Sequence, residues 1–257
     1  MKRIVIILIC AVVTVATAMS LYAQQETKDK GTVSGMTTIT GENEALTRWQ
    51  AGEAVSENAV KLFGLDRCFK AEPISDAVFA RMKGKSYPAN CTVARSDLRY
   101  VKALHYDAEG KLRIGEMVCN KAIANDLVEI FRELFREHYP IERMVLIDNY
   151  DADDERSMRD NNSSCFCYRV VAGSKTLSKH ATGMAVDINT LYNPYVRKRA
   201  NGSMFIQPST AAKYCDRSKN FPYKIVRGDL CQRLFKQHGF RWGGDWKAYK
   251  DYQHFDK

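Results

Sequence analysis

The sequence lacks the motifs of several common functional classes. It has no helix-turn-helix, no sheet motif that interleaves basic and aromatic residues, and no basic run, which argues against nucleic acid as a partner. It also lacks the His-Glu-x-x-His motif of zincins, the Gly-x-Ser-x-Gly turn of serine hydrolases and a papain-like cysteine signature. A zincin, serine or cysteine hydrolase is therefore poorly supported.

The bulk of the chain has the composition of a folded globular protein. Hydrophobic residues make up 45% of its 257 residues and charged residues 27%, and this length suits one well-buried core. Residues 24–43 differ, because they are rich in Thr, Gly, Glu and Lys and contain few large apolar side chains. We therefore expect 24–43 to be a flexible tether and 44–257 to be a single folded domain.

The first 23 residues have the layout of a secretory signal peptide. Met1-Lys2-Arg3 precedes an uncharged run from Ile4 to Ala23, and small residues allow cleavage after Ala18 or Ala23. The run is nearly long enough to span a bilayer, so an uncleaved anchor is the alternative. We expect a monomer exported to the periplasm or cell envelope, with only the signal segment contacting the membrane.

Export would affect how the cysteines and the net charge are interpreted. Seven cysteines remain after Cys10 is removed, and they could form up to three disulfides, although Cys165 and Cys167 would not pair with each other on a strand. None of them has the paired spacing of a cysteine zinc site. The formal charge of +9 becomes about +7 once Lys2 and Arg3 are lost, which favours anionic partners such as cell-wall polymer.

Hydrophobic periodicity predicts a mixture of helices and strands. Residues 98–106 and 112–119 flank a Gly-containing loop, which is typical of a β-hairpin. Apolar residues at spacings of three and four predict an amphipathic helix over 121–138. The remaining elements are predicted to be helix 76–82, strand 141–148, strand 164–171, strand 185–188, a long irregular loop over 194–220 that lines a binding site, and helix 229–238.

Three of the five histidines have an ordinary structural interpretation. His105 lies on a predicted strand, and His138 and His238 lie at helix C-termini, where the helix dipole favours a cation. The acidic turn over 151–155 lacks the alternating ligands, the Gly and the closing Glu of an EF-hand loop. We interpret it as a solvated, helix-capping turn.

The candidate chemistry lies in Ser178-Lys-His-Ala-Thr-Gly-Met-Ala-Val-Asp187 and in Asp251-Tyr-Gln-His254. Asp187 falls in an apolar run, where burial of a charged carboxylate costs folding free energy unless a cation or metal lies beside it. Two His and one Asp are a plausible facial set for Zn that leaves a position open for water, so we expect the ligands His180, Asp187 and His254. Three positions apart on an ideal strand, Asp251 and His254 would face opposite sides, so we predict a turn or bulge between them.

These motifs, with Trp242-Gly-Gly-Asp-Trp246 between them, strongly resemble the bacterial cell-wall zinc peptidases over about 140–257. That family contains D-alanyl-D-alanine carboxypeptidases, D,D-dipeptidases of the vancomycin-resistance type, and L-alanyl-D-glutamate endopeptidases of phages and bacteria. The resemblance implies a single small α+β domain, shared with the hedgehog signalling domain. In that fold an antiparallel sheet carries the zinc site and helices pack on one face.

The resemblance also implies roles for single residues. The family's zinc ligands match His180, Asp187 and His254. Asp251 matches its catalytic acid/base, and its Arg that steadies the scissile carbonyl matches Arg169, with Arg159 as the second candidate. Contacts to substrate are expected from Ser178, Trp242 and Asp245.

The expected function is an exported zinc metallopeptidase that hydrolyses peptidoglycan stem peptides, either at D-Ala-D-Ala or at L-Ala-D-Glu. Zinc would acidify water and polarise the peptide carbonyl, while Asp251 would act as general base and pass the proton to the departing amine. Two alternatives stay open. One is a non-catalytic, zinc-containing module of the same fold that binds the wall or another ligand, and the other is a disulfide-rich interaction protein without zinc.

Overall fold

The computed structural model describes residues 38, 40–171 and 174–257. The predicted signal peptide and most of the tether lie outside these residues. Among the described residues, no helix is both long and apolar enough to cross a membrane. Residues 40–48 are helical, and the Glu42 carboxylate accepts a hydrogen bond from the Ser56 hydroxyl at 2.6 Å. The fold therefore begins a few residues before the expected boundary at 44.

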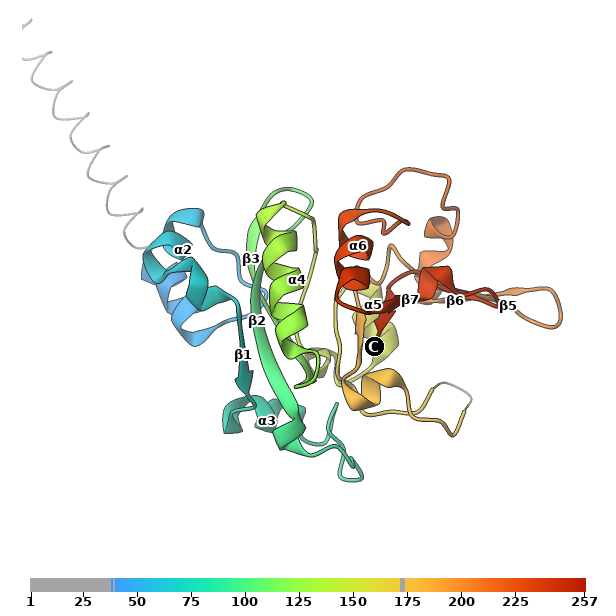
Figure 1. Ribbon diagram of the computed structural model, residues 1–257, viewed down its shortest axis with the longest axis horizontal. Coiled ribbons are helices and arrows are strands. Elements are labelled where there is room, and N and C mark those ends of the chain that lie inside the picture. Colours follow the sequence, from blue (N-terminus) through green and yellow to red (C-terminus); the bar gives the residue numbers. More distant parts are fainter. Residues whose placement is uncertain (1–37, 39, 172–173) are drawn as a thin grey trace, which may run out of the picture.

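A three-stranded antiparallel sheet organises the first half of the fold (Figure 1). Its order is β1-β2-β3, with the strands at Lys70–Pro73, Leu98–Tyr106 and Leu112–Asn120. β2 and β3 are the predicted hairpin, and their register runs from Leu98↔Asn120 to Tyr106↔Leu112. The helix predicted over 121–138 is α4, Ala124–Arg136, which packs against β2 through an apolar face that includes Leu127, Ile130 and Phe131.

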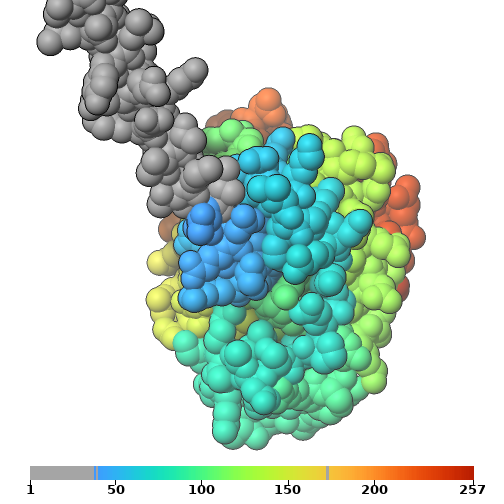
Figure 2. Space-filling view, turned by 90° about the vertical axis from the view of Figure 1, so that its left-hand side faces the viewer, coloured from blue at the N-terminus to red at the C-terminus, as the bar shows by residue number. Residues whose placement is uncertain are grey.

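Short helices cover the outer side of this half. α2 spans Glu57–Phe63, and α3 spans Asp76–Met82, the bounds predicted from the sequence. Each begins after a serine, Ser56 or Ser75, whose hydroxyl accepts a hydrogen bond from a backbone N–H of the first turn. Single 3-10 turns lie at Leu65–Cys68 and Arg95–Asp97. Figure 2 shows these segments, coloured blue to teal, covering the side of the molecule away from the C-terminal elements.

The C-terminal half contains two further antiparallel sheets. One has the order β4-β9-β7, at Ala185–Asp187, His254–Asp256 and Arg241–Trp242. The other has the order β6-β5-β8, at Met204–Gln207, Tyr195–Lys198 and Lys250–Asp251. The described strands are thus antiparallel and the fold is α+β, as expected, and the sheet β4-β9-β7 carries two of the predicted ligands, Asp187 and His254. The strands form three small sheets.

Within the described residues, two helices and four 3-10 turns complete this half. α5 spans Asp154–Arg159, and α6 spans Leu230–Gln237, which confirms the helix predicted at 229–238. The turns lie at Ile147–Tyr150, Lys179–Thr182, Ser209–Tyr214 and Gly243–Asp245. The acidic segment over 151–155 caps a helix, as predicted, because the Asp153 carboxylate accepts a hydrogen bond from the Arg156 N–H at 3.1 Å.

Three element predictions in this half are wrong. Residues 141–148 and 164–171 form no continuous strand, and their backbone groups bond to several different segments. In the second stretch, the N–H groups of Ser164, Phe166 and Cys167 donate to the carbonyls of Asp187, Val118 and His180. This stretch therefore links several neighbouring segments and does not pair continuously with one strand. The irregular loop predicted over 194–220 instead holds the β5–β6 hairpin and the turn after it.

α6 fixes the orientation of the last strand. The Phe235 ring stacks on Phe255 of β9 with their centroids 4.2 Å apart, and it meets Phe240 edge-on at 5.2 Å. All three rings are buried. Because alternate residues of a strand face opposite sides, burial of Phe255 against α6 turns His254 and Asp256 to the other face of β9.

The seven cysteines of the described residues are thiols, so none of the disulfides that export would allow is formed in this structure. Burial raises the pKa of several of them, to about 11 for Cys68 and about 12 for Cys167.

The three histidines interpreted as structural do have structural partners. His105 Nδ1 lies 2.6 Å from the Ile141 carbonyl oxygen, the His138 ring stacks on Tyr106, and His238 Nδ1 lies 3.2 Å from the Asp126 carboxylate.

Candidate metal centre

Strands β4 and β9 bring two of the predicted ligands together. In their antiparallel register, Asp187 is directly opposite His254, and such cross-strand pairs place their Cβ atoms about 5 Å apart. His180 comes from the 3-10 turn that precedes β4. The Ser178 hydroxyl caps this turn by accepting a hydrogen bond from the His180 N–H at 3.2 Å. Ser178 is thus a scaffold residue of the site as well as a part of its wall.

Gly183 makes the close return from this turn into β4 possible. Its φ of +69° lies in the left-handed region, and a Cβ there would come within 2.6 Å of the Asn120 nitrogen on β3. Both features require glycine. The N–H of Asn120 donates to the Gly183 carbonyl at 2.9 Å, so the turn is docked on β3 at this point. The central motif is therefore held by the first sheet.

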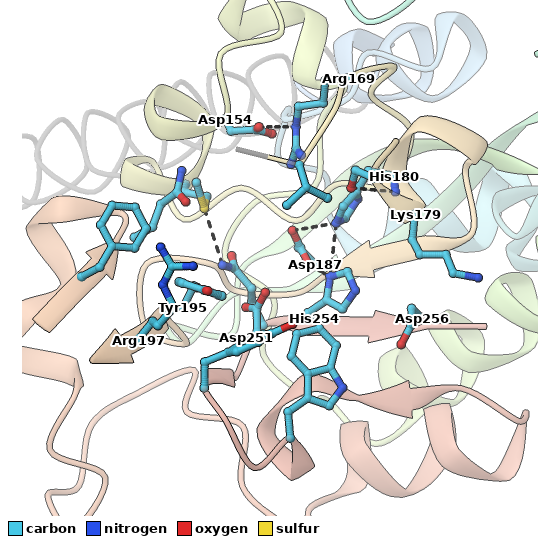
Figure 3. A pocket seen from close by; sticks show the side chains of 18 residues that line it. Asp154, Arg169, Lys179, His180, Asp187, Tyr195, Arg197, Asp251, His254 and Asp256 are labelled. Atoms are coloured by element: carbon cyan, nitrogen blue, oxygen red, sulfur yellow. Dashed lines mark hydrogen bonds and ion pairs between the residues drawn. The ribbon is translucent and has the colours of Figure 1, made fainter. Parts of the chain in front are cut away.

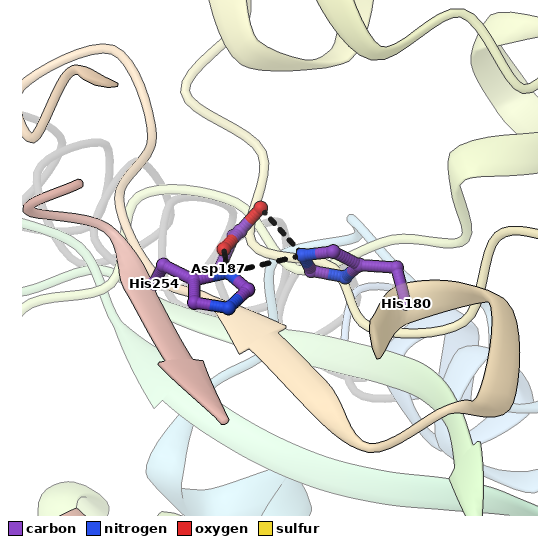
Figure 4. A group of neighbouring side chains, drawn as sticks. All are labelled: His180, Asp187 and His254. Atoms are coloured by element: carbon purple, nitrogen blue, oxygen red, sulfur yellow. Dashed lines mark hydrogen bonds and ion pairs between the residues drawn. The ribbon is translucent and has the colours of Figure 1, made fainter. Parts of the chain in front are cut away.

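The side chains of His180, Asp187 and His254 converge on one point (Figure 4). His180 Nε2 lies 3.2 Å from one Asp187 carboxylate oxygen, and His254 Nδ1 lies 3.0 Å from the other. The two imidazole nitrogens are 3.3 Å apart. One ligand atom from each residue lies within 4.8 Å of the other two, which meets the spacing of a shared metal ion.

The electrostatics of the cluster match a site for a cation. Burial by itself would raise the pKa of Asp187, but the adjacent His180 and His254 outweigh it and hold that pKa far below its ordinary range. Burial would lower the pKa of His254, but Asp187 reverses this and raises it. Asp187 is therefore a carboxylate held in a nearly buried position by its two histidine partners, in line with the compensation that the apolar run around it predicts.

The second nitrogen of His180 is held by the backbone. His180 Nδ1 lies 2.7 Å from the Cys165 carbonyl oxygen. A carbonyl only accepts, so Nδ1 carries the proton and donates it, and Nε2 presents its lone pair to the cluster. Metal-bound histidines commonly make such an outer contact, because it fixes the tautomer and the ring orientation. Two imidazole nitrogens and one carboxylate oxygen fit zinc.

Asp251 reaches the same cavity from a different sheet. It ends β8, and residues 252–253 form a bend before His254 begins β9, which confirms the predicted turn. Gly243 allows the close packing here, since a Cβ on it would meet the Asp251 carbonyl oxygen at 2.5 Å. Burial raises the pKa of Asp251 to about 6. Its Oδ1 is buried and has no hydrogen-bond partner among the described residues.

These groups line a cavity of about 380 Å³ (Figure 3). Part of its wall comes from the stretch over 194–220, which was expected to line a binding site, although its individual residues were not named as candidates. The β5–β6 hairpin and the segment before β8 contribute Tyr195, Arg197, Phe205, Gln207, Trp246 and Tyr249. The dipeptide Asn201-Gly202, a strong turn signal between two alternating stretches, was the sequence feature that could have revealed the hairpin.

Arg169 also lines the cavity, while Arg159 does not. The Arg169 guanidinium pairs with Asp154 and lies near Asp187, and these acids outweigh the effect of burial and raise its pKa. Arg159 instead bonds to Glu155 and to the Ser209 hydroxyl on the surface. Of the two arginine candidates, only the first is placed beside the cluster.

Trp242 and Asp245 do not line the cavity. Trp242 is buried, and its indole N–H donates to the Tyr252 carbonyl at 2.9 Å. Asp245 pairs with Arg227 at 2.5 Å. Their positions support the chain around β7 and give no support to the expected contact with substrate.

The comparison with protein families agrees with these observations. Residues 172–257 match a family model described as D-alanyl-D-alanine carboxypeptidase, and the match includes His180, Asp187, Asp251 and His254. No solved structure gave a significant match to the chain. The resemblance stated from the motifs is thus confirmed: the C-terminal part of the chain, with its candidate ligands and acid/base residue, is similar to the D-alanyl-D-alanine carboxypeptidase family.

Proposed function

We propose that this protein is an exported zinc peptidase that hydrolyses peptidoglycan stem peptides. The observation that carries the proposal is the convergence of His180, Asp187 and His254 at one side of a cavity that also contains the buried carboxyl group of Asp251. The family match supports a peptidase of this substrate class. The signal-like segment at 1–23 supports export to the compartment where that substrate lies.

The three converging residues would hold zinc, which would supply the Lewis acidity that polarises a peptide carbonyl and acidifies water. The remaining steps are carried out by side chains of the protein. Asp251 accepts the proton of the attacking water on its carboxylate and delivers it to the amine that leaves. A carboxyl group with a raised pKa is suited to both halves of this transfer.

Arg169 is proposed to steady the oxygen of the scissile carbonyl. Its guanidinium lies on the same cavity wall as His180 and is held there by Asp154. Because both side chains of this ion pair are only partly exposed, the pair is preorganised before substrate arrives. An aromatic wall formed by Tyr195, Trp246 and Tyr249 offers apolar surface to the peptide on the other side.

Mass spectrometry of purified muropeptides after incubation with zinc-loaded protein tests this function. Loss of terminal alanine identifies a D-Ala-D-Ala carboxypeptidase, and separation between Ala and Glu identifies an endopeptidase. Either product is expected to disappear with a chelator and with Asp251→Asn, which keeps the size of the side chain but cannot accept a proton. Unchanged muropeptides from folded, zinc-loaded protein would contradict the proposal and favour a binding module.

A further inference from the structure

The cations of the cavity differ in whether an acidic group neutralises them. Arg169 is paired with Asp154. Lys179 and Arg197 also line the cavity, are exposed, and form no ion pair within the part of the chain that the structure describes. The stretch 188–215, which contains the β5–β6 hairpin, has no Asp or Glu at all. A cavity wall with uncompensated positive charge is suited to an anionic group on the substrate.

Of these two cations, Arg197 lies on the strand that pairs with the candidate acid/base. Tyr195 of β5 pairs directly with Asp251 of β8 in the antiparallel register. Arg197 lies two residues further along β5, so its side chain is on the same face as Tyr195, and both line the cavity. Figure 3 shows Arg197 next to Tyr195 on the Asp251 side, whereas Lys179 extends away from the three converging residues.

Its neighbours hold the Arg197 side chain at this wall. The guanidinium lies 5.8 Å from the centroid of the Phe205 ring, which comes from the opposite strand of the hairpin. Cation–π contacts of this kind favour one position of an otherwise mobile side chain. The group also lies close enough to the Tyr195 phenol to lower its pKa against the larger effect of burial. The guanidinium is therefore both localised and free of an acidic partner among the described residues.

The side of the cavity occupied by Asp251 is the side on which the leaving amine departs, because Asp251 delivers the proton to it. In a peptide, the α-carboxylate of the leaving residue is separated from that amine by a single carbon. Both candidate bonds place a free α-carboxylate there. Terminal D-Ala carries one, and D-Glu keeps one because the stem peptide continues through its side-chain carboxyl group.

We propose that Arg197 binds the α-carboxylate of the residue whose amine is released, and thereby makes the enzyme specific for substrates in which this group is free. The inference rests on the proposed peptidase function and adds a specificity-determining residue to it. A guanidinium can form two parallel hydrogen bonds to a carboxylate, which a neutral carboxamide cannot reproduce. Amidation of this carboxylate is therefore expected to weaken binding of the substrate.

The test compares one stem pentapeptide in three forms: unmodified, amidated at its C-terminus, and amidated at the α-carboxyl group of D-Glu. The proteins are the wild type, Arg197→Gln and Lys198→Gln. Lys198 is the matched control, because it is an exposed cation one residue away that does not line the cavity. Initial rates give kcat and KM for each combination.

Wild-type protein is expected to hydrolyse the unmodified peptide about 10- to 100-fold more efficiently than the form amidated next to the scissile bond, the range of a charge-assisted hydrogen bond. Arg197→Gln should abolish that preference, mainly through KM, and Lys198→Gln should keep it. An unchanged preference in Arg197→Gln, or an equal loss on both forms, would overturn the inference.

Titration calorimetry with the same peptides and zinc-loaded Asp251→Asn protein separates this inference from the proposed function. A carboxylate preference that depends on Arg197 in binding, without hydrolysis by the wild type, would contradict the peptidase function and leave the recognition by Arg197 standing. Hydrolysis by the wild type with no role for Arg197 in rate or binding would refute the recognition alone.

Discussion

Replacement of Gly183 by alanine is expected to damage both the stability of the fold and the metal centre. Gly183 lies between His180 and Asp187, and its backbone is docked on β3 through Asn120. Two separate costs apply. The left-handed backbone at φ +69° costs an alanine about 1–2 kcal/mol. The added Cβ also meets backbone atoms of β3 at 2.6 and 3.1 Å, where no flexible side chain can yield.

The steric cost can be separated from the backbone cost by a second glycine. Gly110, in the β2–β3 turn, has a φ of +75°, but a Cβ there would meet nothing within 4 Å. Gly110→Ala should therefore cost about 1–2 kcal/mol from its backbone alone. Gly183→Ala carries the same cost and a further 1–3 kcal/mol, roughly, from overpacking.

Urea unfolding of the two zinc-free variants measures these costs as changes in the free energy of unfolding. Zinc titration of each folded variant then reports the geometry of the site. We expect Gly183→Ala to be the less stable of the two and to bind zinc more weakly, because displacement of the turn separates His180 from Asp187. Equal stability and equal zinc affinity in the two variants would refute this account of the turn.

Three further outcomes are expected. Zinc at 100 times its dissociation constant should stabilise the wild type by about 2.7 kcal/mol in thermal unfolding, and His254→Ala should lose this gain. Asp251→Asn should lower kcat about 100- to 10,000-fold while one equivalent of zinc is still bound by metal analysis. Burial lowers the pKa of His105 to about 4 from its ordinary 6.5, so the folded state disfavours its protonation. Between pH 6.5 and pH 4 the unfolded state binds a proton at His105 and the folded state does not. The free energy of unfolding is therefore unaffected by this residue above pH 6.5 and falls by about 3 kcal/mol as the pH drops to 4. His105→Gln should flatten this slope when unfolding is measured against pH.

The sequence identifies the three residues that converge in the structure, because two short motifs contain them. His180 and Asp187 lie on either side of a glycine turn. A carboxylate in an apolar run also indicates that a cation or metal lies nearby to offset the cost of burying its charge. The predicted turn between Asp251 and His254 follows from the two-residue period of a strand alone. In the structure these two residues belong to different sheets that meet at the cavity.

The walls of the cavity were harder to predict, because they depend on contacts between distant segments. Arg197 and Tyr195 line it only since β5 pairs with β8, more than fifty residues later in the chain. Within Trp242-Gly-Gly-Asp-Trp246, spacing does not tell which side chains face the cavity, and only Trp246 does. The apolar stretch at 164–171 has the composition of a strand, but only its residues 165–167 are buried, and its backbone bonds to several different segments in turn.

The most direct test of a metal-dependent peptidase centre is a zinc titration of chelator-treated protein, with hydrolysis of a stem peptide followed at each addition. Activity is expected to rise in proportion to zinc, to reach its maximum at one zinc per chain, and to be absent from His254→Ala at every point. Hydrolysis that persists in the chelator, or full zinc occupancy without hydrolysis, would contradict a metal-dependent peptidase centre.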